Sequence, residues 1–512
     1  MSTSTTPTPD HEVVVIGAGF SGIGAAKALA DAGIHDVSVL EAGDGVGGAW
    51  HWNTYPGVAV DIPSFSYQFS YRQRAGWSRV YAPGQELKAY AEDCVDRYGL
   101  RDRIRLNTKV ATTAFDDDHD LWRVTTDDGG EITARHVIGA TGIFNQPQTP
   151  AIPGLDTFAG PSMHTARWDH DVDLAGKRVA VVGTGASAVQ VIPAIAEEVG
   201  ELVVFQRTPI WCLPKPDARI SKAARTVLRR VPGARRIARA ASQAYVEVTF
   251  PIAAQYATKV PVAAVGERLA KRYLKQQVQD PETRAKLTPT YTLGCKRPSF
   301  HNDYLATFNR EDVTLQTSGI AEVTPTGLRT VDGTHHEVDV LILATGFKAF
   351  ERGNMPPYGV RGVGGKDLEA FWTEHRFQAY EGVSVPGFPN LFSILGPYGY
   401  NGASYFTLIE NQMRHIVRCL TRAREQGATR VEITEQANTR YFDEVLRRRD
   451  GQVFFQGGCG GSNSYYFDAH GDVPFRPSTT VEAAWRAGHF DLDDYAFGSR
   501  VAAPAPAGSA AA

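Results

Sequence analysis

Two glycine-rich turns constrain the fold of this chain more than any other feature, because each lies between an apolar strand and a helix. The first turn follows EVVVI and the second follows RVAVV. Glycine permits the tight turn and lets the backbone approach a pyrophosphate, which the N-terminus of the next helix then faces. The glycines of the two turns are Gly17, Gly19 and Gly22 in the first, and Gly183 and Gly185 in the second. The repeated pattern predicts an α/β protein with two Rossmann-like dinucleotide-binding domains.

The residue that ends the next strand differs between the two turns. Glu41 stands 24 residues after Gly17, where a carboxylate can bind ribose hydroxyls. Arg207 stands 24 residues after Gly183, and its guanidinium can bind a 2′-phosphate that a carboxylate would repel. We therefore expect FAD at the first site and NADPH, in preference to NADH, at the second. Two such sites in one chain indicate electron transfer between the cofactors, with O₂ as the final acceptor.

The order of the segments predicts that the first domain is split in sequence. Two late apolar strands, HVIGATG and VLILATG, mark where the chain leaves each sheet. Prolines between the first of these strands and the second glycine turn indicate a linker. We predict an FAD-binding domain formed by residues 1–152 and 347–512, with an NADP-binding domain at 153–346. The low-complexity end of the chain, 501–512, is expected to form a loose tail.

A basic, helix-rich segment at 215–290 interrupts the second domain and is predicted to be a helical insertion. Between Lys215 and Arg239 it holds nine lysines or arginines and one acid, Asp217. Such a run is typical of a solvated helical face, which is the interpretation we favour. Contact of residues 215–260 with a membrane surface is the alternative, since basic amphipathic helices also bind anionic lipid.

Charge and composition narrow the class of partner. The 512 residues carry 53 Lys plus Arg against 56 Asp plus Glu, so the formal net charge is −3 and nothing favours binding to nucleic acid. The chain has neither a signal-like N-terminus nor an apolar run of about 18 residues, and we expect a cytoplasmic protein with a small-molecule substrate. Its five cysteines include no Cys-x-x-Cys pair, which predicts reduced thiols, no disulfide framework and no metal site.

Two longer motifs resemble those of a known enzyme family. Residues 158–169 match the pattern FxGxxxHxxxW(P/D) at every specified position, and residues 47–61 match (A/G)GxWxxxx(F/Y)P(G/M)xxxD. With FQRTP, GCKR, ATGF and GFPNLF further along, the chain resembles the Baeyer–Villiger monooxygenases over most of its length. Related flavin-containing monooxygenases, which oxidise nitrogen and sulfur centres, usually carry Phe or Tyr where this chain has Trp168.

This resemblance implies a reaction and a catalytic cation. In the family, NADPH reduces FAD, O₂ adds to the reduced flavin, and the resulting peroxyflavin attacks a ketone to give an ester or a lactone. Arg297 matches the family's catalytic arginine, and its guanidinium keeps its proton beside the peroxide. Asp61 matches the family's active-site aspartate, which would orient Arg297 by an ion pair. The presence of both disfavours a non-catalytic redox sensor, and a heteroatom monooxygenase giving N- or S-oxides is the nearer alternative.

The resemblance also implies a set of cofactor contacts. Those expected for the flavin dinucleotide are Gly48, Trp50, Asp61 and Tyr67, with Val110 near its adenine. Those expected for NADPH are Lys296 and Thr208, beside Arg207 at the 2′-phosphate, and Ser187 and Gln190 at the phosphates or ribose. His164 is expected to couple the two domains rather than to act as a base. The aromatic pieces FPIAAQY, GPYGYNGASYF and SYYF hint at an apolar pocket, while the choice of ketone and the oligomeric state stay open.

Overall fold

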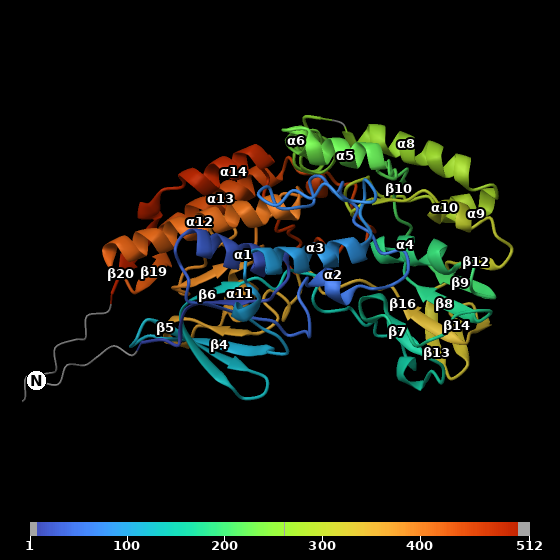
Figure 1. The fold of residues 1–512 in the computed structure, drawn as a ribbon. Coiled ribbons are helices and arrows are strands. Elements are labelled where there is room, and N and C mark those ends of the chain that lie inside the picture. Colours follow the sequence, from blue (N-terminus) through green and yellow to red (C-terminus); the bar gives the residue numbers. More distant parts are fainter. Residues whose placement is uncertain (1–7, 261, 500–512) are drawn as a thin grey trace, which may run out of the picture.

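The computed structural model describes residues 8–260 and 262–499, and the expected tail at 501–512 lies outside them. Figure 1 shows two bodies of strands and helices side by side, with layers of long helices above them. Each body is built on a sheet with parallel central strands, and in each sheet one of these strands leads into one of the two glycine turns. The predicted α/β class with two Rossmann-type sheets is confirmed.

The first sheet forms around the first glycine turn. Four consecutive apolar residues of its central strand, β1, are buried, as expected for a parallel strand covered on both faces. The last strand of the sheet comes from far along the chain and pairs with the second half of β6. The parallel strands are β1 (His11–Ile16), β2 (Val37–Leu40), β3 (Ile104–Arg105), β6 (Glu131–Gly139) and β18 (Leu391–Ser393).

An antiparallel extension shares β6 with this sheet. The first half of β6 pairs with β5 (Leu121–Thr126), which pairs in turn with β4 (Val110–Asp116). β17 (Gly359–Arg361) lies beside β4. Residues that follow position 347 therefore contribute two strands, β17 and β18, to the sheet that the N-terminal residues begin.

The second sheet has five parallel strands in the order β12, β9, β8, β16, β7. They are β7 (Ser162–His164), β8 (Arg178–Val182), β9 (Glu201–Phe205), β12 (Val313–Gln316) and β16 (Val340–Leu343). The helix α4 (Ala186–Ile195) follows the second glycine turn and packs its apolar face into the core on one face of this sheet. A small antiparallel sheet lies beside it, formed by β13 (Ile320–Thr324), β14 (Gly327–Thr330) and β15 (His335–Glu337).

Helices from both ends of the chain cover the first sheet. The helix α12 (Tyr405–Gln426) packs against α1 (Phe20–Asp31), and a Cβ at Gly24 of α1 would come within 2.6 Å of the Ile409 side chain on α12. A small residue at position 24 is therefore needed for this contact. The other helices and strands of this part are α2 (Ala49–Trp52), α3 (Gly84–Arg97), α11 (Leu368–His375), α13 (Glu435–Arg449), α14 (Thr480–His489), β19 (Arg430–Ile433) and β20 (Tyr495–Gly498).

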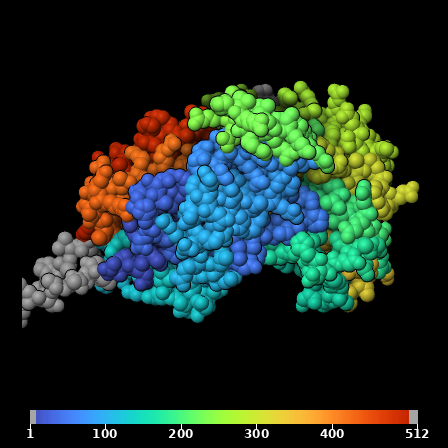
Figure 2. Space-filling model, in the orientation of Figure 1, coloured from blue at the N-terminus to red at the C-terminus, as the bar shows by residue number. Residues whose placement is uncertain are grey.

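The 215–290 segment is helical and lies at the outer surface of the molecule, where its first helices, in green, cap the space-filling view of Figure 2. No residue of α5 is buried, which fits the expected solvated face. Among the described residues, no helix is both long and apolar enough to cross a membrane. The elements in this segment and next to it are β10 (Cys212–Leu213), α5 (Lys222–Arg230), α6 (Ala234–Glu247), a π-helical turn (Val248–Ile252), α7 (Ala253–Gln255), α8 (Val262–Gln277), α9 (Pro281–Lys286), β11 (Ser299–Phe300) and α10 (Tyr304–Thr307).

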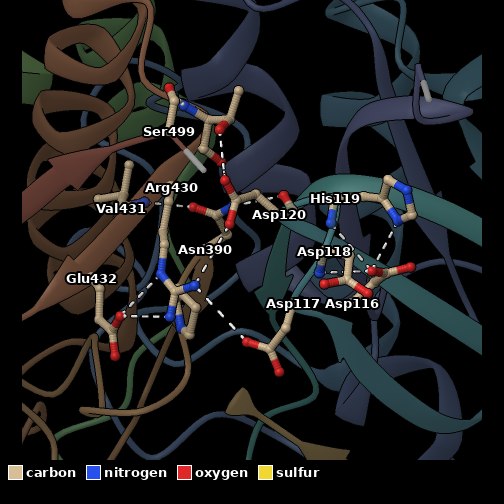
Figure 3. A network of polar contacts seen from close by, with 12 residues as sticks. Asp116, Asp117, Asp118, His119, Asp120, Asn390, Arg430, Val431, Glu432 and Ser499 are labelled. Carbon is tan, nitrogen blue, oxygen red and sulfur yellow. Dashed lines mark hydrogen bonds and ion pairs between the residues drawn. The ribbon is translucent and has the colours of Figure 1, made fainter. Parts of the chain in front are cut away.

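A polar network ties the β4–β5 hairpin to the C-terminal part of the chain, as Figure 3 shows. The amide of Asn390, which is fully buried, donates to the carbonyl oxygens of Asp120 (3.2 Å) and Thr429 (2.8 Å). Its side-chain oxygen accepts the Val431 N–H at 2.8 Å. Arg430 lies 3.6 Å from the Asp120 carboxylate. One buried amide thus joins the two parts of the first body.

Candidate active site

A cavity of about 1840 Å³ lies at the carboxyl ends of the strands of both sheets. This is where the Rossmann-type sheet places its ligands, because the loops and helix N-termini that bind phosphates meet there. All but one of the residues expected at the site line this cavity. The exception is Gly22, which is buried in the first turn of α1.

The first glycine turn has the shape that a pyrophosphate cradle requires. Gly17 has a φ of 107°, a conformation that favours glycine. A Cβ at Gly22 would lie 1.8 Å from the Gly17 carbonyl oxygen, and a Cβ at Gly48 would lie 2.9 Å from Cα of Gly19. Side chains at these positions would fill the space between strand, helix and the 47–48 turn, so the residues present fit a bound dinucleotide.

Glu41 lies at the end of β2, as predicted, and is buried. Its two carboxylate oxygens accept the backbone N–H groups of Ala18 at 2.6 Å and Gly43 at 2.9 Å. Each carboxylate oxygen has a second lone pair, so both can still accept a ribose hydroxyl. The two backbone contacts fix the carboxylate toward the cavity that it lines.

The second glycine turn carries a cluster of positive charge. A Cβ at Gly183 would lie 2.4 Å from the Ala344 carbonyl oxygen, while nothing lies within 4 Å of a Cβ at Gly185. Arg207 is exposed beyond β9, and neither it nor Lys296 forms an ion pair with a described residue. Burial, together with the positive charge of Arg207, lowers the pKa of Lys296 to about 8. Two cations without a counter-charge form a site suited to a phosphate.

Arg297 and Asp61 form an ion pair inside the cavity. The Arg297 Nε donates to Asp61 Oδ2 at 2.6 Å, and the side chains are 18% and 33% exposed. Burial would raise the pKa of Asp61, but the Arg297 guanidinium outweighs it and holds the pKa of that carboxyl below its usual value. The same pair raises the pKa of Arg297 despite burial. Both groups therefore stay charged.

Aromatic side chains surround this ion pair. The Arg297 guanidinium lies over the Phe250 ring, 4.9 Å from its centroid. Tyr400 and Tyr466 line the same cavity, and burial raises the pKa of Tyr400 to about 12 although Arg297 acts in the opposite direction. These residues come from the three aromatic pieces that the sequence singled out. The Arg297 guanidinium thus lies among aromatic side chains, where its electric field is less screened than in water.

Trp50 and Tyr67 lie together on the side of the cavity that the first glycine turn lines. The Trp50 indole N–H donates to the Tyr67 hydroxyl at 3.1 Å, and their rings meet edge to face with centroids 5.8 Å apart. Val110, the first residue of β4, is buried behind the end of β2 and also lines the cavity. These placements are compatible with the flavin contacts that the motif implies.

Gln190 makes a set of contacts that its motif does not predict. Its side-chain oxygen accepts the Tyr55 hydroxyl at 2.9 Å and the Ala59 N–H at 3.3 Å, and its amide donates to the Ala59 carbonyl at 2.9 Å. Gln190 therefore joins α4 to the loop that carries Asp61, while Ser187 on the same helix is half-buried and lines the cavity. The predicted contacts of Ser187 and Gln190 with NADPH stay predictions.

The expectation that all five cysteines are reduced is wrong for two of them. Cys295 and Cys459 form a disulfide, with their Cα atoms 5.2 Å apart and a separation of 164 positions in sequence. No cysteine-spacing motif predicts a disulfide between residues so far apart in sequence, because only the folding of the chain brings the two cysteines together. The other three cysteines are free and buried, as expected of reduced thiols.

Lys215 also departs from expectation. The sequence places it at the start of a solvated basic run, yet its ammonium lies 4.9 Å from the centroid of the Tyr81 ring. Burial lowers the pKa of Lys215, while Asp217 and Asp61 act in the opposite direction. Lys215 thus belongs to the surroundings of Asp61. The number of lysines and arginines in the basic run could not distinguish it from its exposed neighbours.

His164 lies where the second sheet meets the chain that leaves it. Its Nδ1 accepts the Ala166 N–H at 3.0 Å, and its ring packs against Phe347 with centroids 6.0 Å apart. Burial lowers the pKa of His164 to about 4, so the ring is neutral at pH 7. A neutral, packed ring at this junction is compatible with the predicted coupling role.

Comparisons with known proteins agree with this geometry. A family model described as "Pyridine nucleotide-disulphide oxidoreductase" matches residues 14–306. A Baeyer–Villiger monooxygenase of Pseudomonas aeruginosa is 38% identical over 469 residues, covering 90% of this chain and 87% of that protein.

Two solved structures extend the likeness over the whole fold. Cyclohexanone monooxygenase from Rhodococcus sp. Phi1, bound to NADP+, has a TM-score of 0.86 at 30% identity and covers 96% of this chain and 100% of that one. OTEMO in complex with FAD and NADP has a TM-score of 0.84 at 30% identity and covers 94% of this chain and 97% of that one. The chain therefore belongs to the pyridine nucleotide-disulphide oxidoreductase family and, within it, to the FAD-containing, NADPH-dependent Baeyer–Villiger monooxygenases.

Proposed function

We propose that this enzyme oxygenates a small ketone with O₂ and NADPH, giving an ester or a lactone. The observation that carries the proposal is the Arg297–Asp61 ion pair, 2.6 Å between donor and acceptor, in a cavity that both glycine turns line. A fixed cation in an apolar pocket is what the developing negative charge on an attacked carbonyl oxygen requires.

Each glycine turn would hold one of the two cofactors at the cavity. Bound FAD supplies the activation of O₂, which no side chain of the protein can perform alone. The first glycine turn and Glu41 hold its pyrophosphate and ribose. Trp50 and Tyr67 pack beside its ring system.

NADPH binds at the second turn, and the basic cluster gives the preference over NADH. Arg207, Lys296 and Thr208 bind the 2′-phosphate that only NADPH carries. The guanidinium and the ammonium are both free of acidic partners among the described residues, so they are available to this ligand. Bidentate binding by Arg207 adds geometric selectivity to charge.

Arg297 acts on the substrate and Asp61 acts through Arg297. The guanidinium keeps its proton at every working pH, so its positive charge at the site is constant. It donates hydrogen bonds to the carbonyl oxygen as that atom gains negative charge. Asp61 fixes the plane of the guanidinium, and Phe250 with Tyr466 keeps water from it.

The division of the chain into 1–152 with 347–512 and an inserted 153–346 remains part of the proposal. It is supported by the pairing of β18 with β6, which returns residues after 347 to the first sheet. It is also supported by the five strands of the second sheet, all of which lie between residues 162 and 343.

The test is a measurement of NADPH and O₂ consumption over linear, cyclic and aryl ketones and one sulfide, with mass spectrometry of the products. We expect a ketone to gain one oxygen atom, and Arg297→Ala to lower that rate by about 100-fold or more. Arg310→Ala, which removes an exposed arginine paired with Asp312, is the matched control and should leave the rate unchanged. Oxygenation of the sulfide alone, or formation of hydrogen peroxide alone, would contradict the proposal.

A further inference from the structure

The Cys295–Cys459 disulfide occupies a position that neither the fold nor the proposed reaction explains. Cys295 directly precedes Lys296 and Arg297, so one sulfur is joined through the backbone to both functional cations. Cys459 belongs to a segment at 456–467, named here the cysteine loop. Cys295 is fully buried, whereas Cys459 is half-buried near the surface. A thiol reductant can therefore reach the bond from the side of Cys459.

The cysteine loop reaches both functional clusters of the cavity. The side-chain amide of Asn463 donates to the Thr208 hydroxyl at 2.7 Å, beside the cationic cluster. Tyr465 and Tyr466 lie at the other end, close enough for the charge of Arg297 to act on their hydroxyl groups. All three loop residues line the cavity together with Lys296 and Arg297. The cysteine loop therefore lies beside both the cationic cluster at Arg207 and Lys296 and the Arg297–Asp61 ion pair.

Gln456 at the start of the loop is tied by hydrogen bonds to Asp450, Gln452 and Val453, and the disulfide holds the glycine-rich stretch that follows. The Thr292 N–H donates to the Gly458 carbonyl oxygen at 2.9 Å, and a Cβ at Gly458 would lie 2.0 Å from the Thr292 hydroxyl oxygen. The sequence around Cys459 is QGGCGGSNS, with two glycines on each side of the cysteine. Glycine loses more conformational freedom on ordering than any other residue. A covalent bond in the middle of this stretch therefore removes most of this conformational freedom before any ligand binds.

We propose that the Cys295–Cys459 bond is a reducible latch that positions the cysteine loop over the NADPH site. A dithiol reduces it in a balanced exchange: the S–S bond breaks, Cys295 and Cys459 each gain a proton and an electron, and the dithiol becomes a disulfide. Release loosens Asn463 and Tyr466, weakens nucleotide binding and admits water to Arg297. Cys295 and Cys459 are positioning residues, and this inference rests on the proposed placement of NADPH.

The first experiment asks whether the bond forms and whether it orders the loop. The purified holoenzyme is equilibrated with oxidised or reduced dithiothreitol, denatured and alkylated, and the alkyl groups are counted by mass spectrometry. We expect alkylation of the three cysteines that are free in the structure after oxidation, and of all five after reduction. Hydrogen exchange of residues 456–467, measured without nucleotide, should be faster in the reduced protein.

The second experiment measures the dissociation constant of NADP+ by titration, which needs no ketone turnover. Reduction should raise it by about 3- to 10-fold, the cost of immobilising the loop side chains at the moment of binding. Cys459→Ser should bind NADP+ as weakly as the reduced wild type and should not respond to dithiothreitol. Cys419→Ala removes a free thiol in α12 and should respond as the wild type does.

Three results would overturn the inference: five alkylated cysteines after oxidation, an NADP+ dissociation constant that reduction leaves unchanged, or a Cys459→Ser variant that still responds. A bond that merely stabilises the fold would lower the melting temperature of Cys459→Ser and leave NADP+ affinity as it was. Failure of the proposed ketone oxidation would appear instead in product analysis, with these NADP+ measurements unaffected.

Discussion

The Asp61 carboxylate illustrates how one charged residue controls another at this site. Its pKa stays below the ordinary range because Arg297 outweighs the effect of burial, so the pair is ionised throughout the neutral range. Replacing Asp61 by Asn keeps the shape and an acceptor but removes the counter-charge. Arg297 would then lose the ion pair that fixes its orientation and would be free to turn toward the solvent.

We expect Asp61→Asn to lower the kcat of ketone oxygenation by about 10- to 100-fold, a typical cost of losing a group that orients a catalytic residue. FAD content, measured from the absorbance of the purified protein, should remain that of the wild type. Asp44→Asn is the control, because Asp44 is an exposed partner of His51 outside the pair. An Asp61→Asn enzyme with full kcat would refute the orienting role.

Lys296 predicts a pH dependence for NADPH binding. Burial and the charge of Arg207 lower its pKa to about 8, so in the free enzyme the ammonium loses its proton as the pH rises through 8. A phosphate prefers the protonated form. The KM for NADPH should therefore be constant below this pH and increase above it, by about 10-fold if one charged hydrogen bond is lost.

Steady-state kinetics at pH 6 to 10 would test this dependence. NADH, which lacks the 2′-phosphate, serves as the internal control and should show no such increase. Lys296→Arg keeps its charge and should flatten the NADPH profile. An equal increase in KM for both nucleotides would point to a group other than Lys296.

At the scale of elements, the two ends of α1 give a matched pair of glycines. A Cβ at Gly22 would lie 1.8 Å from a backbone oxygen, whereas nothing lies within 4 Å of a Cβ at Gly33, where φ is 72°. Gly22→Ala should therefore displace the first glycine turn and sharply reduce FAD content. Gly33→Ala should cost only about 1 kcal/mol of unfolding free energy and retain FAD. Comparable FAD loss in both variants would contradict the steric argument.

The polar network of Figure 3 predicts a stability effect far from the cavity. Asn390→Ala would remove three hydrogen bonds between this buried amide and backbone groups of the first body. We expect a loss of about 2–4 kcal/mol in unfolding free energy, measured by urea denaturation. Arg352→Ala removes an exposed ion pair with Glu369 and should change stability by less than about 1 kcal/mol. Similar losses in both variants would argue against this account of the network.

Sequence patterns predicted the elements that local chemistry specifies and missed those that depend on tertiary contact. The glycine turns, β1 and the strand-end position of Glu41 follow from hydrophobic pattern and turn chemistry. The place of Arg297 beside Asp61 followed only from the family motifs. The stacking of Phe250 on Arg297, the burial of Lys215 and the disulfide of Cys295 could not be predicted, since each joins segments that no spacing rule relates.

Over the whole molecule, the two dinucleotide sites must be held in register, and Gln190 lies at the contact that holds them. Its three hydrogen bonds connect α4 of the second body to the loop at 55–59, which leads to Asp61. A Cβ at Gly57 would lie 2.6 Å from the Gln190 carbonyl oxygen, so loop and helix are in close backbone contact. We therefore expect this interface to contribute to the orientation of one cofactor relative to the other, beside other contacts between the two bodies such as that of Arg167 with Trp52.

Gln190→Leu therefore tests whether the interface sets the geometry or whether Gln190 binds NADPH directly. If it sets the geometry, FAD content and NADP+ affinity should persist, while anaerobic bleaching of the flavin absorbance by NADPH should slow by about 10- to 100-fold. Ser187→Ala, which removes a hydroxyl that lines the cavity but keeps the Gln190 contacts to Tyr55 and Ala59, should instead weaken NADP+ binding and leave the bleaching rate at saturation unchanged. A Gln190→Leu enzyme that loses only NADP+ affinity would assign Gln190 to the ligand and leave the register of the two bodies to the remaining contacts.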